Sequence, residues 1–247
     1  MHSMGRFAAK LMACAAPALL AVTSPAAPYP GMAPIDAYLM DRTEEIALAK
    51  SAAPNSISRH ATVLILTRTG YETAVTGSNG FVCWVGRGFG GAFDWPERWN
   101  PKIRGAECEN PQAARSVLPL AKLRTAMILA GRTTAETIDR IKIAVSSKEI
   151  PPLESGAMSY MMSKSSYLTD AGGHDMPHLM FFVAVKDAAD WGANAPDSPV
   201  VGGNYLVLHT GPRSRNRQPA APVGLHHRSY HLVGRHARFG APDVADA

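Results

Sequence analysis

The alternation of apolar and polar residues along the chain predicts a domain built from short strands. Runs rich in apolar, β-branched and aromatic residues occur at 61–67, 71–76, 81–85, 157–163, 178–185 and 204–209. Glycine-bearing connectors separate the first three runs, so we expect those three to form an antiparallel meander. The run at 178–185 is almost wholly apolar, which is typical of a strand covered on both faces, and it is the predicted central strand.

Helical periodicity is found in three other segments. The first covers 34–50, the second covers 114–130, and the third runs from 133 to the prolines at 151 and 152. Gly131 lies where the second helix needs a C-cap, and Thr133 with Glu136 forms a capping box that opens the third helix. The pattern therefore predicts an α+β domain, with an antiparallel sheet of about five or six strands and helices packed on one face.

The segment 1–27 differs in character from the rest of the chain. Arg6 and Lys10 precede an apolar run, and small residues follow at 24–27, which is the pattern of a secretory signal peptide. The alternatives are a buried apolar helix and, because of Cys14, a lipoprotein leader. We expect a signal peptide over 1–27, export to the periplasm or the cell exterior, and no transmembrane segment in the mature chain.

Charge and composition divide what remains into a domain over 28–209 and a tail over 210–247. The net charge is +5, of which the segment 1–27 carries +2 and the tail carries +4, so the body has a net charge of −1. This distribution gives no reason to expect a nucleic-acid partner, and it leaves a small-molecule or protein partner undefined. The tail is rich in Arg and His and lacks periodicity, which predicts disorder.

The cysteine count bears on how the fold is stabilised. If Cys14 leaves with the signal peptide, only Cys83 and Cys108 remain, in a chain bound for an oxidising compartment. A disulfide between them is the prediction, and two buried free thiols are the alternative, because sequence cannot place the two Cα atoms within bridging distance. Closing a loop of this size stabilises a fold by about 3 kcal/mol on the chain-entropy model.

One segment offers candidate metal ligands. A long polar loop between the runs at 157–163 and 178–185 carries His174 and Asp175, and His178 follows it. Neutral imidazoles suit zinc, copper or iron, and nearby methionines would add soft ligands for Cu(I). Two histidines are too few for a site. The alternative is that His178 is an ordinary hydrogen-bonded residue at the start of a strand, His174 is solvated, and the methionines fill the core.

Other motifs give weaker indications of function. A G-x-G-x-x-G match at 86–91 is followed by residues that cannot open a phosphate-binding helix. Trp95 and Trp99, in the irregular stretch 86–111, could form an aromatic wall for a ligand, although aromatic residues in such loops more often anchor the loop to the core. Tyr160 and Lys164 have the spacing of a dehydrogenase pair without a dinucleotide fold around them. No serine-hydrolase signature is present, and enzymatic activity stays an open question.

Several short motifs together resemble a family of exported bacterial proteins to which no activity is assigned. They are GYETAVTG at 70–77, NGFVC at 79–83, WNP at 99–101, AARSVLP at 113–119, GAM at 156–158, GGH at 172–174 and PHLMFF at 177–182. The resemblance covers about residues 33–200 and implies export. This chain departs from the family pattern in two ways. It lacks a further histidine between positions 174 and 178. Its end also differs from the family's ordered tail, and is either a native tail or the product of a frameshift.

Two functional classes follow from these patterns. The first is a binding or structural domain of the periplasm or cell exterior, because no nucleophile, base and orienting group can be assembled from the sequence. The alternative is a metal-binding protein or metal-dependent enzyme that uses the loop of His174, Asp175 and His178.

Overall fold

A single sheet organises the fold. The computed structural model describes residues 28–170, 177–183, 189–192, 195–196, 198, 200–202 and 205–209. Eight strands form the sheet in the order β2-β1-β3-β4-β5-β6-β8-β7. The strands are β1 (Thr62–Leu66), β2 (Tyr71–Val75), β3 (Val82–Gly86), β4 (Gly105–Glu109), β5 (Met158–Met161), β6 (His178–Phe182), β7 (Val200–Gly202) and β8 (Tyr205–His209). The α+β class is confirmed, with more strands than the five or six expected.

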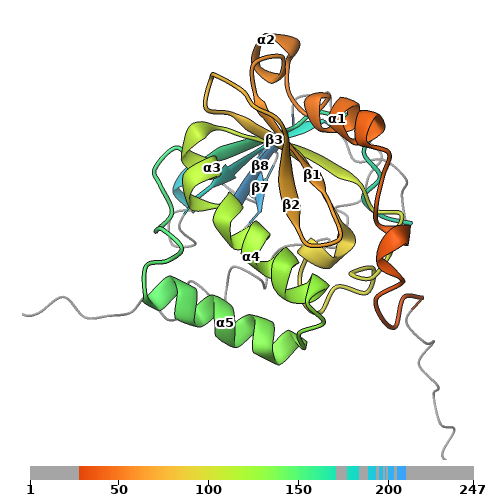
Figure 1. The fold of residues 1–247 in the computed structure, drawn as a ribbon. Helices are drawn as coiled ribbons and strands as arrows, with labels where there is room; N and C mark the ends of the chain where they lie inside the picture. The colour runs from red at the N-terminus through yellow and green to blue at the C-terminus, as the bar shows by residue number, and fades with distance from the viewer. Residues whose placement is uncertain are drawn as a thin grey trace, which may run out of the picture.

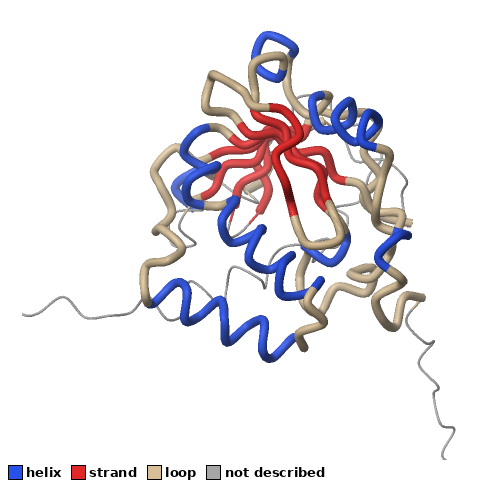
Figure 2. Tube along the Cα trace, in the orientation of Figure 1, coloured by secondary structure: helices blue, strands red, loops and turns tan. Residues whose placement is uncertain are grey.

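Helices cover both faces of this sheet. The α-helices are α1 (Arg42–Lys50), α2 (Asn55–Ser58), α3 (Pro111–Ser116), α4 (Leu118–Leu129) and α5 (Thr134–Ser146), and the 3-10 turns are η1 (Ile35–Ala37), η2 (Gly88–Gly90) and η4 (Ala189–Trp191). Figures 1 and 2 show the strands in the middle, with α1 on one side and α4 on the other. The expectation of helices on one face is therefore wrong. None of these described helices has the length and apolar character needed to cross a membrane.

The two faces have separate cores, and we name each face by its main helix. On the α1 face, Ala49 packs with Val63, Val85 and Ala106, all of them buried. On the α4 face, Leu118 and Ile128 pack with Leu64, Leu66, Tyr71 and Trp84, and residues of α3 pack with Met161, Met180 and Phe182. Helix α5 contacts α4 and lies away from the sheet (Figure 1). Burial on both faces explains why the sequences of β1 and β3 are almost wholly apolar.

The positions of the strands follow the sequence pattern, but their pairing does not. β1 and β2 form the expected antiparallel hairpin. β3 then pairs with β1, in parallel, and leaves β2 at the edge of the sheet. The sheet is therefore mixed, and the predicted meander is wrong. β6 is an interior strand, as its apolar sequence predicted, with β5 and β8 as neighbours.

Helix boundaries agree with the predictions only in part, and the predicted helix over 114–130 is divided into α3 and α4 at Val117. The predicted helix over 34–50 is interrupted, because the Asp41 carboxylate accepts the backbone N–H groups of Thr43 and Glu44 and opens α1 there. The Thr133–Glu136 capping box is present and opens α5. Gly131 has a φ of 71°, the left-handed conformation that ends a helix and favours glycine.

The irregular stretch before β4 is an ordered loop, which we call the 87–104 loop. Gly88 lies against the returning chain, so a Cβ there would come within 2.8 Å of the Arg98 carbonyl oxygen and 3.1 Å of that of Asn100. No side chain fits, and only glycine lets these two segments touch. The loop then enters β4, a strand that the sequence pattern did not predict. The G-x-G-x-x-G match contributes only the 3-10 turn η2.

The predicted disulfide joins the centre of the sheet. Cys83 and Cys108 are direct cross-strand partners in β3 and β4, and their sulfur atoms are bonded. Both side chains are fully buried on the α1 face. Because the bond closes a loop with a sequence separation of 25 residues, it restricts the unfolded chain and thereby stabilises the fold.

A buried ion pair ties α1 to the sheet. The Arg87 Nη2 atom donates to Glu45 Oε1 at 2.8 Å, and both side chains are almost completely inaccessible to solvent. The remaining guanidinium nitrogens of Arg87 donate to the carbonyl oxygens of Tyr38 and Val85. Glu45 also accepts the backbone N–H of Leu66. One charge pair thus connects η1, α1, β1 and β3, with every nitrogen of the guanidinium satisfied.

We predict that removing one partner of this pair destabilises the protein more than removing both. Glu45→Gln or Arg87→Met alone leaves a buried charge without compensation, at a cost of about 3–5 kcal/mol in the free energy of unfolding. The double variant Glu45→Gln, Arg87→Met should lose less than the sum of the single changes. Denaturant unfolding of all four proteins measures the coupling.

The exposed pair of Arg115 and Glu154 provides the control. The Arg115 side chain is 59% exposed, so Arg115→Met should change the free energy of unfolding by at most about 1 kcal/mol. Additive losses in the Glu45 and Arg87 variants would contradict the role assigned to the buried pair.

Candidate functional site

His178 is the one predicted metal ligand that the structure describes. It begins β6, its side chain is buried, and it lies on the α4 face as the register partner of Met161. His174 and Asp175 lie outside the described residues. Met180, one of the methionines near them in sequence, is buried in the core between the sheet and α3. Within the described part of the chain, no group of three His, Cys, Asp or Glu side chains could hold a metal ion.

The backbone register adds one histidine that the sequence analysis did not connect with this segment. His209 ends β8 directly opposite His178 in β6. The pairing of β6 with β8 could not be predicted from sequence, because η4 and β7 lie between the two strands along the chain.

The chain just before residue 171 is held firmly in place. Asp170 accepts a hydrogen bond from Lys102 Nζ at 2.8 Å and further hydrogen bonds from the hydroxyl groups of Tyr29 and Tyr167. These donors hold the pKa of Asp170 well below its usual range. Its backbone N–H donates to Glu97 in the 87–104 loop. The approach to the segment that carries His174 is thus anchored at the base of that loop.

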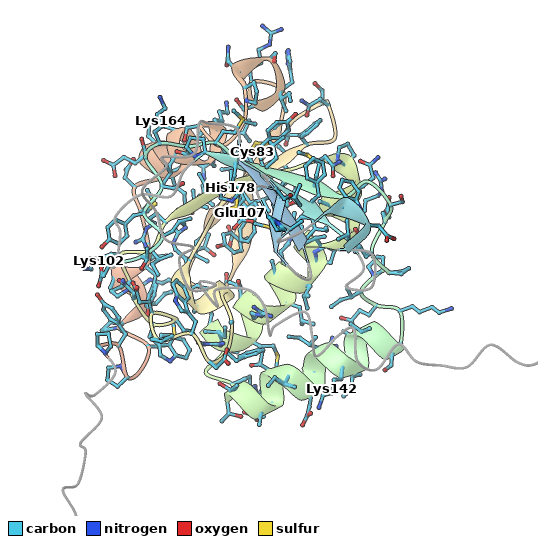
Figure 3. All side chains as sticks on the ribbon, turned by 180° about the vertical axis from the view of Figure 1, so that it is seen from behind. Cys83, Lys102, Glu107, Lys142, Lys164 and His178 are labelled. Atoms are coloured by element: carbon cyan, nitrogen blue, oxygen red, sulfur yellow. A yellow bond between two sulfur atoms is a disulfide. The ribbon has the colours of Figure 1, made fainter. Side chains whose placement is uncertain are left out.

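Two glutamates in the middle of the sheet form a second polar cluster. Glu107 and Glu109 flank Cys108 in β4, so they lie on the α4 face, opposite to the disulfide. Glu109 is 1% exposed and Glu107 is half-buried. Glu107 lies across from Trp84, and Glu109 lies across from Ser159. Figure 3 shows Glu107 and His178 toward the middle of the fold, whereas Lys102 and Lys142 lie at its periphery.

Burial determines the charge state of this carboxyl pair. Desolvation raises the pKa of Glu107 to about 7, and desolvation together with the neighbouring Glu107 charge raises the pKa of Glu109 well above its usual range. The indole N–H of Trp84 opposes the pKa shift at Glu109. Neither Trp84 Nε1 nor Glu109 Oε2 has a hydrogen-bond partner in the described part of the chain. The pair is therefore mainly protonated below neutral pH.

Paired glycines make room for the Glu107 side chain. Gly86 and Gly105 are cross-strand partners next to Trp84 and Glu107. A Cβ on Gly86 would come within 2.9 Å of Glu107 Oε1, and one on Gly105 would come within 3.0 Å of Leu168. The Glu107 carboxyl group thus packs directly against the Gly86 backbone, in space that a side chain would otherwise fill.

The 87–104 loop carries a third cluster, in which aromatic rings contact cations. The Arg98 guanidinium carbon lies 4.4 Å from the centre of the Phe93 ring and 4.8 Å from that of Trp99. Trp99 packs against the core beside Tyr38 and Phe89, and the Trp95 ring lies against Gly91. The two tryptophans hold the loop, as the anchoring alternative predicted, and Trp99 also covers Arg98.

Sequence reasoning missed the acidic pair and Arg98 for the same reason. Glutamates alternating with small residues in β4, and an arginine in a loop rich in Gly and Pro, are typical of solvent-facing positions. No local pattern could have identified them, because only the tertiary packing of α3 and α4 on this face, and of Trp99 on the loop, removes these groups from water.

Comparison of the chain with protein-family models, curated proteins and solved structures finds no match.

We predict that stability falls as pH rises through neutrality because of Glu107. Its pKa is raised in the folded state, so the folded protein binds more protons than the unfolded chain between about pH 4.5 and 7. The stabilisation is complete below the unfolded pKa and is lost as pH rises through the folded pKa, by up to about 3 kcal/mol. Glu107→Gln should flatten this dependence and be the more stable protein at pH 8.

Thermal unfolding from pH 5 to pH 8 measures this effect. Glu44→Gln is the matched control, because Glu44 is exposed on α1 and its replacement should leave the pH profile unchanged. Parallel profiles for the wild type and Glu107→Gln would show that Glu107 is not the titrating group.

Proposed function

We propose that the protein is an exported binding domain that works in an oxidising compartment. The observation that carries this proposal is the disulfide. Cys83 and Cys108 are the only cysteines after the segment 1–27, and they meet as fully buried cross-strand partners in the sheet. Such bonds persist in secreted and periplasmic proteins and are rare in reducing compartments. The signal-like start and the resemblance to exported bacterial proteins support the same conclusion.

The binding role rests on the contrast between the sheet and the 87–104 loop. Binding residues are often carried by loops that a rigid scaffold positions. The loop is fixed at one end by the Arg87 ion pair and near the other by Glu97, which accepts hydrogen bonds from Thr169, Asp170 and Asn100. It therefore presents its side chains in a defined arrangement on the disulfide-stabilised sheet.

Expression in a bacterial host with and without the segment 1–27 tests the proposal. We expect the full-length gene to yield periplasmic protein that has been cleaved close to Ala27 and contains no alkylatable thiol. The shortened chain, kept in the cytoplasm, should contain free Cys83 and Cys108 thiols and be less stable by about 3 kcal/mol until it is oxidised. Retention of the intact chain in the cytoplasm, or free Cys83 and Cys108 thiols in exported protein, would refute it.

A metal-binding function is the second candidate, favoured by one observation. The register places His178 and His209 opposite each other on β6 and β8, which supplies a second histidine beyond the loop of His174 and Asp175. Imidazole ligands from adjacent strands suit zinc or copper.

Metal-induced thermal shifts test this candidate. Zinc or copper should raise the melting temperature of the wild type by a few degrees and that of His178→Ala by much less. His60→Ala is the matched control, because His60 is exposed. An equal response of all three proteins would exclude a specific site at His178.

A further inference from the structure

Arg98 is a buried cation whose hydrogen-bonding capacity is only partly used. Its side chain is 3% exposed. Its Nε and Nη1 atoms are buried and have no hydrogen-bond partner in the described part of the chain. No carboxylate of the described residues lies within ion-pair distance of Arg98. A buried charge without a counter-charge is among the most unfavourable features that a folded protein can contain.

The neighbouring rings compensate for this charge only in part. Phe93 and Trp99 attract the guanidinium through the electron-rich faces of their rings, at centroid distances of 4.4 and 4.8 Å. An aromatic face is a much weaker acceptor for an N–H group than a carboxylate, phosphate or carbonyl oxygen. The rings hold the guanidinium in place and leave its N–H groups available to a stronger acceptor.

A second arginine raises the positive potential at this place. Arg124 in α4 is also buried, and its guanidinium carbon lies 4.8 Å from the centre of the same Phe93 ring. Arg124 Nη1 donates to the carbonyl oxygen of Gly91 at 3.1 Å and also to that of Gly90. Desolvation and the Arg124 charge lower the pKa of Arg98 to about 10, which still leaves Arg98 charged at neutral pH.

We propose that Arg98, supported by Arg124, binds a small oxyanion, the carboxylate, sulfate or phosphate group of a ligand, where the 87–104 loop meets α4. An oxyanion accepts hydrogen bonds from the guanidinium and neutralises the charge that the rings leave uncompensated. Because Arg98 is 3% exposed, the bound group has few atoms, which excludes polyanions such as nucleic acid. This inference deepens the proposed function, since it names the ligand chemistry of the exported binding domain.

Thermal unfolding of the purified, oxidised protein with formate, sulfate or phosphate tests the site. Sodium chloride holds the ionic strength at about 0.1 M, so that general screening is constant. We expect at least one oxyanion to raise the melting temperature of the wild type by about 5 °C near saturation, and chloride to have a much smaller effect. The relative size of the melting-temperature shifts with formate, sulfate and phosphate indicates whether the ligand group is a carboxylate, a sulfate or a phosphate.

Arg98→Met separates a binding role from a structural one. Methionine keeps an unbranched apolar side chain between the rings but removes the charge, so without oxyanion this variant should be at least as stable as the wild type. Its melting temperature should then rise by less than about 1 °C with the oxyanion. If Arg98 served only to join the two rings, Arg98→Met would be destabilised, and the wild type would not respond to oxyanions.

The matched control is Arg59→Gln, because Arg59 is exposed next to α2 and its variant should keep the full response. Equal shifts in the wild type, Arg59→Gln and Arg98→Met would identify a general salt effect and overturn the proposal. So would the absence of a shift in all three. If Arg98→Met does not fold, titration calorimetry of the wild type decides, and the proposal fails unless one oxyanion binds at one site per chain.

Failure of the anion site and failure of the proposed function give different results. Export and oxidation are measured by location and thiol content, which do not depend on any oxyanion. An exported, oxidised protein whose melting temperature does not change with any of the three oxyanions would remain a binding domain with another ligand.

Discussion

The buried ion pair between Glu45 and Arg87 is the interaction on which the arrangement of this protein depends. Arg87 directly follows β3, and its guanidinium connects the sheet with α1 and with the chain after η1. Because the same residue begins the 87–104 loop, the pair also fixes where that loop leaves the sheet. The loop then lies against Gly88, where only a glycine lets it approach. The position of the loop that carries Arg98 therefore depends on this charge pair.

Buried ionisable groups in the described part of the chain meet the cost of desolvation in different ways. Glu45 and Arg87 neutralise each other through direct hydrogen bonds. Among the described residues, Glu107 and Glu109 have no basic partner, and burial instead raises their pKa values so that they hold protons. An arginine cannot lose its charge near neutral pH, and no carboxylate of the described residues pairs with Arg98, so an external anion is the counter-charge that we propose for it. This difference in chemistry is why the arginine identifies a ligand site more directly than the glutamates do.

The sequence predicted local features better than long-range ones. The β-branched runs placed β1, β2 and β3 within a residue or two, and the Thr133–Glu136 capping box placed the start of α5, because both signals depend on neighbouring residues. The parallel pairing of β3 with β1 was not predictable, since it depends on which edge of β1 is open once the hairpin with β2 has formed. β4 was missed because its alternating glutamates do not resemble a buried strand.

The candidate site was predicted only in part. The sequence identified Cys83 and Cys108, His178 and the tryptophans of the loop, whose chemistry is evident from residue type. It could not identify Arg98, because its significance comes from contacts with Phe93 and Trp99 and from burial by the folded chain. Diffraction from crystals soaked with selenate, an oxyanion that scatters anomalously, tests the central claim most directly. The predicted anomalous peak lies about 4 Å from a guanidinium nitrogen of Arg98, with a selenate oxygen at about 3 Å, the ordinary hydrogen-bond distance. An Arg98 guanidinium whose nitrogens all bond to protein oxygens, with peaks only elsewhere, would contradict it.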